Sequence, residues 1–444
     1  GGTRGIGFSD VKKFLEHGAK VALLGSRQET VDKALWQIKE EDANAEVVGY
    51  WPDLMNAEEV NDVFMKVKEL YGSLDILVNN DQVIAYPYRG NIISLGIMDR
   101  TKEHLLVFQL YVLLKRIQEL KRLKRSKKYY ACVSFLDSAN VANIISGSND
   151  CKVLVSVRNS LLQQNKLPQF RYIVNPLAKI LYDYADKVVA VSEGIETELR
   201  DFLKLRKEKI KVIENGCDFL KIANESQRGL TADENRKFSN RKIVVTVGRL
   251  TVQKGQWHLI RAFNEVVRNI PDVLLMILGT GELEKYLKKL VSLYGLNDSV
   301  YFMGYVTNPY KYMIQSDVFV LPSLYEGFPN AMAEAICLGV PCIAADFRTG
   351  ARELLAPGEE LPESGIKYKR EVQYGILTPV CSGIQYNSVE EPLELSELML
   401  AKAMIEILQD EKKREEYCRK SKLRSKSLNI YDKVKEWIDV IEKC

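Results

Sequence analysis

The feature that most constrains the fold is a repeated alternation of short apolar segments with longer helical patterns. Before residue 80, expected strands at 20–24, 45–50 and 74–78 alternate with expected helices at 8–17, 28–41 and 56–70. A second series begins near residue 91 and a third near residue 242. Strands that alternate with helices of this length form βαβ units on parallel sheets. The sequence therefore predicts an α/β protein of two halves, joined by a linker in the polar stretch 221–240.

Composition excludes several classes of protein. The 444 residues suffice for two or three domains, and 63 Lys and Arg against 59 Asp and Glu leave a net charge of only +4. This balance argues against a nucleic-acid partner, which usually requires a basic excess. The eight cysteines form no CxxC pair and the three histidines lack metal-ligand spacing, so we expect a cytoplasmic protein with reduced thiols and no metal. No apolar run approaches the roughly 20 residues of a membrane-spanning helix.

A glycine-rich turn opens the chain. Glycines before a helix let backbone N–H groups approach a pyrophosphate, and an arginine after the next strand can pair with a 2′-phosphate. The residues of this pattern are Gly1, Gly5, Gly7, Arg27, Asp53 and Asn79. Together they resemble the first 80 or so residues of short-chain dehydrogenase/reductases of the NADP-preferring kind.

The same segment departs from that family around its catalytic residues. The family's Asn-Asn-Ala-Gly reads Asn-Asn-Asp-Gln at 79–82. The family also uses a Tyr-x-x-x-Lys pair, in which the lysine lowers the pKa of the tyrosine for proton transfer. Of 22 tyrosines, only Tyr111 and Tyr431 have a lysine four residues later, and neither stands at the family's distance from residue 80. Three interpretations stay open: a packing scaffold without chemistry, which we favour, a segment that binds NADP without catalysis, or an active reductase.

Two loops that follow expected strands carry charged residues. Strand 244–247 runs into a loop with Arg249 and Lys254, two cations that can neutralise a diphosphate leaving group. Strand 318–321 leads to Glu326 and, eight residues later, Glu334. Between these glutamates, residues 327–330 would present free N–H groups at a helix N-terminus, which suit phosphate oxygens. The alternative is that the cations are solvated and the glutamates serve as a helix cap and a surface charge.

Residues from about 85 to 444 resemble a retaining glycosyltransferase of family 4. The resemblance rests on motifs in family order at 212–218, 248–254, 278–281, 302–304, 316–317, 326–334 and 338–341. It implies the GT-B fold, in which two Rossmann-like domains face a cleft. It also implies transfer of a sugar from a UDP- or GDP-sugar to a glycan or lipid-linked acceptor, with retention of anomeric configuration.

The resemblance assigns roles to individual residues. Arg249 and Lys254 would hold the donor diphosphate, Glu326 the donor sugar, and Glu334 the ribose hydroxyls. The other expected donor-binding residues are Gly248, Gly279, Gly281, Phe302, Gly327, Phe328, Pro329 and Asn330. The chain contains no Asp-x-Asp motif, which fits an enzyme that replaces a divalent metal with cationic side chains and helix dipoles. No cofactor is required by this interpretation, and NADP is expected only if the N-terminal segment binds it.

Three further features have weaker implications. Arg158 and Asn159 match an Arg-Asn pair that some family members carry near the acceptor. The run 115–128 holds eight Lys or Arg in fourteen residues, and a basic amphipathic helix can bind an anionic membrane, here the inner membrane face. The alternative for this run is a solvated helix face. His258, one turn after Lys254, is expected to serve packing or the surface.

The two resemblances share no residues and meet near 81–90, which indicates a fusion. We expect a dehydrogenase-like segment (1–84), the rest of an acceptor domain (85–225), a donor domain (226–425) and a C-terminal helix that packs back on the N-terminal domain (426–444). The alternatives to a glycosyltransferase are an NADP-dependent oxidoreductase and a catalytically inactive hybrid.

Overall fold

The computed structural model describes residues 5–16, 18–25, 27–52, 57–71, 106–126, 129–147, 151–164 and 175–444. The chain divides into two compact units, Gly1–Arg116 and Ile117–Cys444. All eight cysteines are free thiols, and none of them is exposed.

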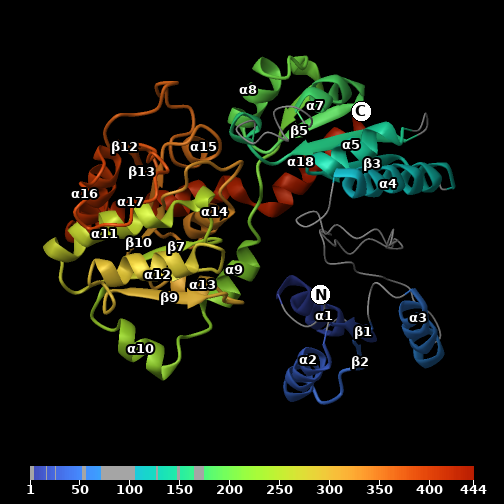
Figure 1. The fold of residues 1–444 in the computed structure, drawn as a ribbon, viewed down its shortest axis with the longest axis horizontal. Helices are drawn as coiled ribbons and strands as arrows, with labels where there is room; N and C mark the ends of the chain where they lie inside the picture. Colours follow the sequence, from blue (N-terminus) through green and yellow to red (C-terminus); the bar gives the residue numbers. More distant parts are fainter. Residues whose placement is uncertain are drawn as a thin grey trace. The chain divides into compact units, whose positions relative to one another are not determined.

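The first unit has a small parallel sheet (Figure 1). It also has a hydrophobic core of its own. Its elements are α1 (Gly5–Glu16), β1 (Val21–Leu24), α2 (Gln28–Glu41), β2 (Val47–Tyr50) and α3 (Ala57–Tyr71). The strands β1 and β2 pair in parallel, with Val21 opposite Val47. Leu23, Val31 and Ile38 are buried in the cluster between this sheet and its helices. The expected elements before residue 72 therefore form, whereas the expected strand 74–78 lies outside the described residues.

The second unit begins with a four-stranded parallel sheet in the order β3-β4-β5-β6. Its strands are β3 (Ala131–Phe135), β4 (Lys152–Val157), β5 (Lys187–Ala190) and β6 (Ile210–Val212). Helix α4 (Leu106–Ser126) includes the boundary between the two units. The other helical segments of this part are α5 (Asp137–Ile145), α6 (Leu161–Gln164), α7 (Asn175–Leu181), η2 (Tyr182–Tyr184), α8 (Glu193–Asp201) and η3 (Lys207–Lys209). Strand β4 is apolar and buried along nearly its whole length, as expected for a strand covered on both faces.

A seven-stranded sheet follows, in the order β12-β13-β11-β10-β7-β8-β9. Its strands are β7 (Lys242–Val247), β8 (Val273–Leu278), β9 (Val300–Gly304), β10 (Val318–Leu321), β11 (Cys342–Ala345), β12 (Arg370–Val372) and β13 (Gly375–Thr378). The edge strand β12 pairs antiparallel to β13, while the other pairs are parallel. The helical segments are η4 (Val252–Lys254), α11 (Gln256–Asn269), α12 (Glu284–Leu293), α13 (Tyr310–Met313), α14 (Asn330–Cys337), α15 (Ala351–Leu355), α16 (Leu395–Gln409), α17 (Glu411–Ser425) and η5 (Lys426–Leu428).

The seven-stranded sheet has an apolar core on each face. Val244 belongs to the cluster that includes residues of α11, α12 and α16, while the next residue, Val245, belongs to the other cluster. Successive side chains of a strand point to opposite faces, so an uninterrupted apolar strand supplies both cores. This explains why β7, β8 and β10 read as continuous apolar runs in the sequence.

The polar stretch 221–240 folds largely as two capped helices, α9 (Phe219–Ser226) and α10 (Ala232–Phe238). Asp218 caps α9 by accepting a hydrogen bond from the Lys221 amide at 3.0 Å. Thr231 and Glu234 form a reciprocal capping box on α10. Local side-chain hydrogen bonds therefore build helices in a segment whose composition resembles that of a loop.

The last helix, α18 (Ile430–Glu442), packs against the four-stranded sheet. Its Val440 is buried with Leu154, Val189 and Ile213, which belong to that sheet or follow it directly. The ring of Trp437 lies 5.7 Å from that of Phe135. The chain thus returns to the first sheet of this unit after completing the second.

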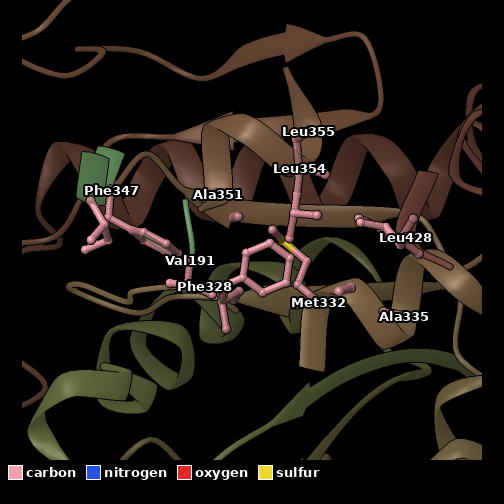
Figure 2. Close-up of a cluster of buried hydrophobic side chains, with 14 of the residues drawn as sticks. Val191, Phe328, Met332, Ala335, Phe347, Ala351, Leu354, Leu355 and Leu428 are labelled. Atoms are coloured by element: carbon pink, nitrogen blue, oxygen red, sulfur yellow. The ribbon is translucent and has the colours of Figure 1, made fainter. Parts of the chain in front are cut away.

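Apolar side chains also connect the two halves of the second unit. Val191, which follows β5, lies in the same buried cluster as Phe328 and Phe347 of the other half (Figure 2). The cluster continues through Leu354 to Leu428, near the start of α18. Within the described ranges, no helix combines the length and apolarity needed to cross a membrane.

Candidate functional site

The two cations of the expected donor site lie on the loop between β7 and α11. Arg249 is exposed, and Lys254 ends the short helix η4. Gly255 follows with a φ of 61°, a left-handed conformation that glycine adopts without strain. A Cβ on Gly255 would also lie 2.6 Å from the carbonyl oxygen of Pro322, so this turn packs tightly onto the end of β10. The glycine thereby brings Lys254 to the neighbouring strand end.

Lys254 and Glu326 form an ion pair at that strand end. The Nζ atom of Lys254 lies 2.5 Å from Oε1 of Glu326, and both side chains are largely buried. Glu326 also accepts hydrogen bonds from Ser323 Oγ at 2.8 Å and from Gln253 Nε2 at 3.1 Å. Its carboxylate is therefore held by three donors from two loops, which orients it before any ligand binds.

The segment after Glu326 packs against the loop that follows β4. Gly327, Phe328 and Pro329 are buried, while Asn330 is exposed at the start of α14. A Cβ on Gly327 would lie 1.9 Å from the carbonyl oxygen of Arg158, so only glycine fits. The structure thus brings the expected acceptor residues Arg158 and Asn159 into contact with the expected donor loop.

Arg158 has an unusual environment for a cation. Its guanidinium carbon lies 5.1 Å from the ring centre of Phe135. Burial lowers the pKa of this guanidinium to about 10, because the surroundings solvate its charge poorly. The neighbouring Asn159 is exposed. Arg158 therefore remains charged at neutral pH, with its charge only partly hydrated.

Glu334 lies on α14, one residue past its first turn. Tyr310 of α13 donates a hydrogen bond to Oε1 of Glu334 at 3.1 Å. Burial raises the pKa of Glu334, and the Tyr310 hydrogen bond and the charge of Lys221 oppose this rise. At the start of the same helix, Asn215 donates a hydrogen bond to Asn330 Oδ1 at 2.6 Å. Two expected site residues, Glu334 and Asn330, are thus supported by neighbours from other segments.

The glycines after β8 meet the cationic loop. Gly279 has a φ of 139°, and a Cβ there would lie 2.0 Å from the carbonyl oxygen of Gly248. A Cβ on Gly281 would come within 2.3 Å of the Leu250 carbonyl oxygen. Phe302 of β9 is partly buried, with the ammonium of Lys288 5.7 Å from its ring centre. The loops after β7 and β8 therefore touch, while Phe302 packs toward α12.

The residues of the N-terminal turn are only partly described. Gly5 and Gly7 lie in the first turn of α1, and Arg27 is exposed directly before α2. Gly1, Asp53 and Asn79 lie outside the described residues. This unit is compact by itself, and the structure does not relate these residues to the site in the second unit.

His258 belongs to a buried polar cluster behind the cationic loop. Its Nδ1 lies 2.7 Å from Glu397 Oε1, and its Nε2 accepts a hydrogen bond from the Gly383 amide at 3.2 Å. Arg261 also binds Glu397, at 2.8 Å. In the described ranges, His258 with Cys381 and Glu394 is the group whose spacing could suit a metal ion. Because both ring nitrogens are engaged and a guanidinium lies beside them, we interpret the cluster as structural, as expected for His258.

Several residues of this site were not predicted from the sequence. Gln253 and Ser323 lie within the loops that carry Lys254 and Glu326, so their position beside motif residues was the available signal. Tyr310 stands 24 residues before Glu334, and no spacing links the two. Thr349, which donates a hydrogen bond to the backbone oxygen of Glu326, is likewise visible only in the structure.

Family models match three parts of the chain. A model described as glycosyl transferases group 1 matches residues 228–371, and one described as glycosyltransferase family 4 matches residues 108–219. A short chain dehydrogenase model matches residues 1–86. The matches divide the chain where the sequence changes from one resemblance to the other.

Curated relatives divide in the same way. An uncharacterized glycosyltransferase of Methanocaldococcus jannaschii is 33% identical over 342 residues, which cover 75% of this chain and 84% of that protein. A diphospho-undecaprenol 4-alpha-N-acetylgalactosaminyltransferase of Campylobacter jejuni is 30% identical over 267 residues, 60% of this chain and 62% of the relative. A 3alpha-hydroxysteroid dehydrogenase of Mediterraneibacter gnavus is 56% identical over 80 residues, which cover 18% of this chain and 32% of that enzyme.

Solved structures share the fold. Sucrose-phosphate synthase from Thermosynechococcus elongatus matches with a TM-score of 0.63 at 19% identity, over 87% of this chain and 93% of its own. Anabaena HepE, solved in complex with UDP, matches with a TM-score of 0.58 at 19% identity, over 76% of this chain and 83% of its own. At this identity the likeness establishes the GT-B fold alone. With the family models and the Methanocaldococcus relative, it shows that the chain belongs to the group 1, family 4 glycosyltransferases, preceded by a segment of the short-chain dehydrogenase family.

Proposed function

We propose that this glycosyltransferase moves a sugar from a UDP- or GDP-sugar to a glycan or lipid-linked acceptor, with retention of anomeric configuration. The observation that carries the proposal is the Lys254–Glu326 ion pair at the N-terminal side of α14, with Glu334 on the same helix. A cation from the loop between β7 and α11 then meets one short segment that carries backbone N–H groups and two carboxylates. These are the groups needed to bind a diphosphate and sugar hydroxyls together.

Each residue has a role in this proposal. Lys254 and Arg249 hold the diphosphate and offset the charge that develops on it as the glycosidic bond breaks. The amides of Gly327 and Phe328 bind phosphate oxygens, because Pro329 has no N–H group and the Asn330 amide donates to the Phe328 backbone oxygen at 3.1 Å. Glu334 binds the ribose hydroxyls. Glu326, released from Lys254 when the diphosphate arrives, accepts hydrogen bonds from the donor sugar. In this mechanism, the leaving phosphate oxygen takes the acceptor proton on the same face of the sugar, so the protein contributes position and charge.

The printed descriptions of relatives support the substrate classes. HepE was solved with UDP, and the name of the Campylobacter relative specifies a diphospho-undecaprenol acceptor. The contact of Arg158 with Gly327 supports an acceptor site beside the donor loop. We carry these classes to the present chain as part of the proposal.

Nucleotide binding and donor turnover test this function. We expect isothermal titration to show binding of UDP or GDP, and expect Lys254→Ala and Glu334→Ala to weaken it by roughly tenfold or more, since each removes a charged hydrogen-bonding group. Glu265→Ala, at a partly exposed position of α11 in the same domain, is the matched control. Proton NMR of the transfer product reports the anomeric configuration. Binding of NADPH without binding of either nucleoside diphosphate would contradict the proposal and favour the oxidoreductase alternative.

We also propose that the exposed basic face of α4 touches an anionic membrane. Lys121, Arg122 and Arg125 are exposed, whereas Lys124 points inward and donates hydrogen bonds to the backbone and side chain of Asn143. Burial lowers the pKa of Lys124, so this residue contributes to packing and leaves fewer charges for a membrane than the sequence suggested.

Sedimentation with vesicles tests this membrane contact. Replacing Lys121, Arg122 and Arg125 with Gln should reduce binding to vesicles that contain anionic lipid, because each basic residue near such a surface contributes about 1 kcal/mol. The same three-charge reduction at the exposed Lys412, Arg419 and Lys426 is the control. Equal loss of vesicle binding in both variants would show that binding depends on the net charge of the protein and not on the basic face of α4.

A further inference from the structure

One carboxylate joins the two Rossmann-like domains of residues 117–444. The Oε2 atom of Glu353, in α15, accepts a hydrogen bond from the Glu193 amide at 2.7 Å, and its Oε1 accepts one from the Gly194 amide at 3.0 Å. These are the first two residues of α8, in the other domain. Its Oε1 also accepts from Gly350, in its own domain, at the longer distance of 3.2 Å. Because the first N–H groups of a helix lack partners within the helix, a carboxylate binds them well.

The backbones of the two domains are in direct contact beside this carboxylate. A Cβ on Gly194 would lie 2.6 Å from the Arg348 carbonyl oxygen and 2.8 Å from Cγ2 of Thr349. No larger residue fits there without moving the domains apart. The buried cluster of Val191 with Phe328 and Phe347 lies in the same region (Figure 2).

The segment that carries Glu353 also supports the donor loop. Thr349 donates a hydrogen bond from its hydroxyl to the backbone oxygen of Glu326. A Cβ on Gly350 would lie 2.7 Å from Cδ of Pro329. Residues 349–353 therefore contact the donor loop at one end and α8 at the other.

A second glutamate, in α8, holds the loop that carries Arg158. Glu198 accepts hydrogen bonds from Ser160 Oγ at 2.7 Å and from the Leu161 amide at 2.6 Å. These residues follow Arg158 and Asn159, whose backbone lies against Gly327 of the donor loop. The contacts are therefore continuous. The donor loop contacts residues 349–353, Glu353 contacts α8, α8 contacts residues 160–161, and Arg158 contacts the donor loop again.

We propose that Glu353 is a positioning residue for the transfer reaction, which holds the acceptor-side loop 158–162 in register with the donor loop 326–330. The inference rests on the proposed function for its catalytic consequence, but the contact itself is independent of it. Glu353 touches no substrate in this proposal. It acts through α8, and its loss separates two loops that must meet around one sugar.

Amide hydrogen exchange tests the contact directly. In Glu353→Gln, the side-chain NH2 group would face one of the two α8 amides, so exchange in a peptide covering 191–196 should rise by roughly tenfold or more as that bond is lost. Exchange in a peptide covering 158–164 should rise with it. The control is Glu359→Gln, since Glu359 accepts a backbone hydrogen bond from Gln373 at 2.8 Å within its own domain. Unchanged exchange at 191–196 in Glu353→Gln would overturn the proposal.

Kinetics then separate a positioning role from a merely structural one. Glu353→Gln should leave UDP or GDP affinity nearly unchanged, because Arg249, Lys254 and Glu334 stay in place. It should lower kcat/KM for the acceptor by roughly tenfold or more while affecting donor hydrolysis less. A parallel loss of nucleotide affinity, donor hydrolysis and transfer would indicate a general folding defect and contradict the proposal.

A second variant keeps the proposal testable even if Glu353→Gln fails to fold. Gly194→Ala keeps Glu353 but places a methyl group in the contact between the domains. It should reproduce the exchange and kinetic pattern of Glu353→Gln, and wild-type behaviour would contradict the proposal. If wild type lacks donor turnover but both variants still raise exchange at 191–196, the proposed function fails while the contact stands. The two failures are therefore distinguishable.

Discussion

At the residue scale, burial and hydrogen bonding have opposite effects on the pKa values of the glutamates near the site: burial raises them and hydrogen bonds lower them. Burial raises the pKa of Glu353 to about 7, although three backbone amides that bind its carboxylate lower it, and the charge of Glu193 raises it further. The guanidinium of Arg424, from α17, binds the backbone oxygen of Glu353 at 3.0 Å. The pKa of Glu334 is also raised, and burial is again the largest cause. These carboxyl groups therefore retain a proton at higher pH than an exposed glutamate does.

Glu353 should make stability depend on pH. A carboxyl whose pKa is raised on folding contributes stability that is present below its unfolded value of 4.5 and is lost as pH rises to about 7. The full shift corresponds to roughly 3 kcal/mol, an upper limit for this one group. Denaturant unfolding at pH 5 and pH 8 should therefore show a smaller pH-dependent loss of stability in Glu353→Gln than in wild type. Parallel pH profiles for the two proteins would contradict this expectation.

At the element scale, the α/β pattern was predictable because strands and helices have different periods of apolar residues. The strands Val21–Leu24, Lys242–Val247 and Val318–Leu321 form where the sequence predicted strands at 20–24, 244–247 and 318–321. The sequence did not predict α9 and α10, whose residues are polar and which depend on caps and neighbours. In α10, Glu234 also accepts hydrogen bonds from Lys311 and from Tyr312 of α13. These tertiary contacts stabilise a helix that its composition alone does not indicate.

The capping box of α10 should be measurable. Removing the Thr231 hydroxyl leaves the Glu234 amide without its side-chain acceptor, so Thr231→Ala should lower the free energy of unfolding by about 1 kcal/mol. Urea denaturation followed by circular dichroism measures this change. Thr251→Ala is a useful comparison because the Thr251 hydroxyl, which precedes η4, makes no side-chain cap. An equal effect of both substitutions would show that the box contributes nothing specific.

At the scale of the whole molecule, two families share one chain, and the described residues of the first unit form a core of their own. Leu23, Val31 and Ile38 form a cluster confined to the described residues of the first unit. One large cluster of the second unit includes residues from both of its sheets. The expectation that residues 1–84 complete the acceptor domain stays a prediction, since β1 and β2 form a sheet of their own among the described strands.

Separate cores predict separate unfolding transitions. Leu23→Ala should destabilise the first unit by roughly 2–5 kcal/mol and lower the temperature of one calorimetric transition. Leu154→Ala, at an equally buried position of β4, should lower the other transition. UDP or GDP binding should survive Leu23→Ala, because the donor residues lie in the second unit. A single transition shifted by both substitutions would contradict this independence.

The sequence by itself determined the α/β class, the positions of most strands along the chain and the motifs that follow these strands. These features are local: strand periodicity covers a few residues, and parallel strands place their carboxyl ends at one edge of a sheet. That is why Lys254 and Glu326, on the loops that follow the neighbouring strands β7 and β10, could be assigned to one site. Only the tertiary structure decided which loops of the two domains meet. Glu353 and Glu193 are 160 residues apart, and their contact depends on how two complete domains pack, which no local pattern encodes.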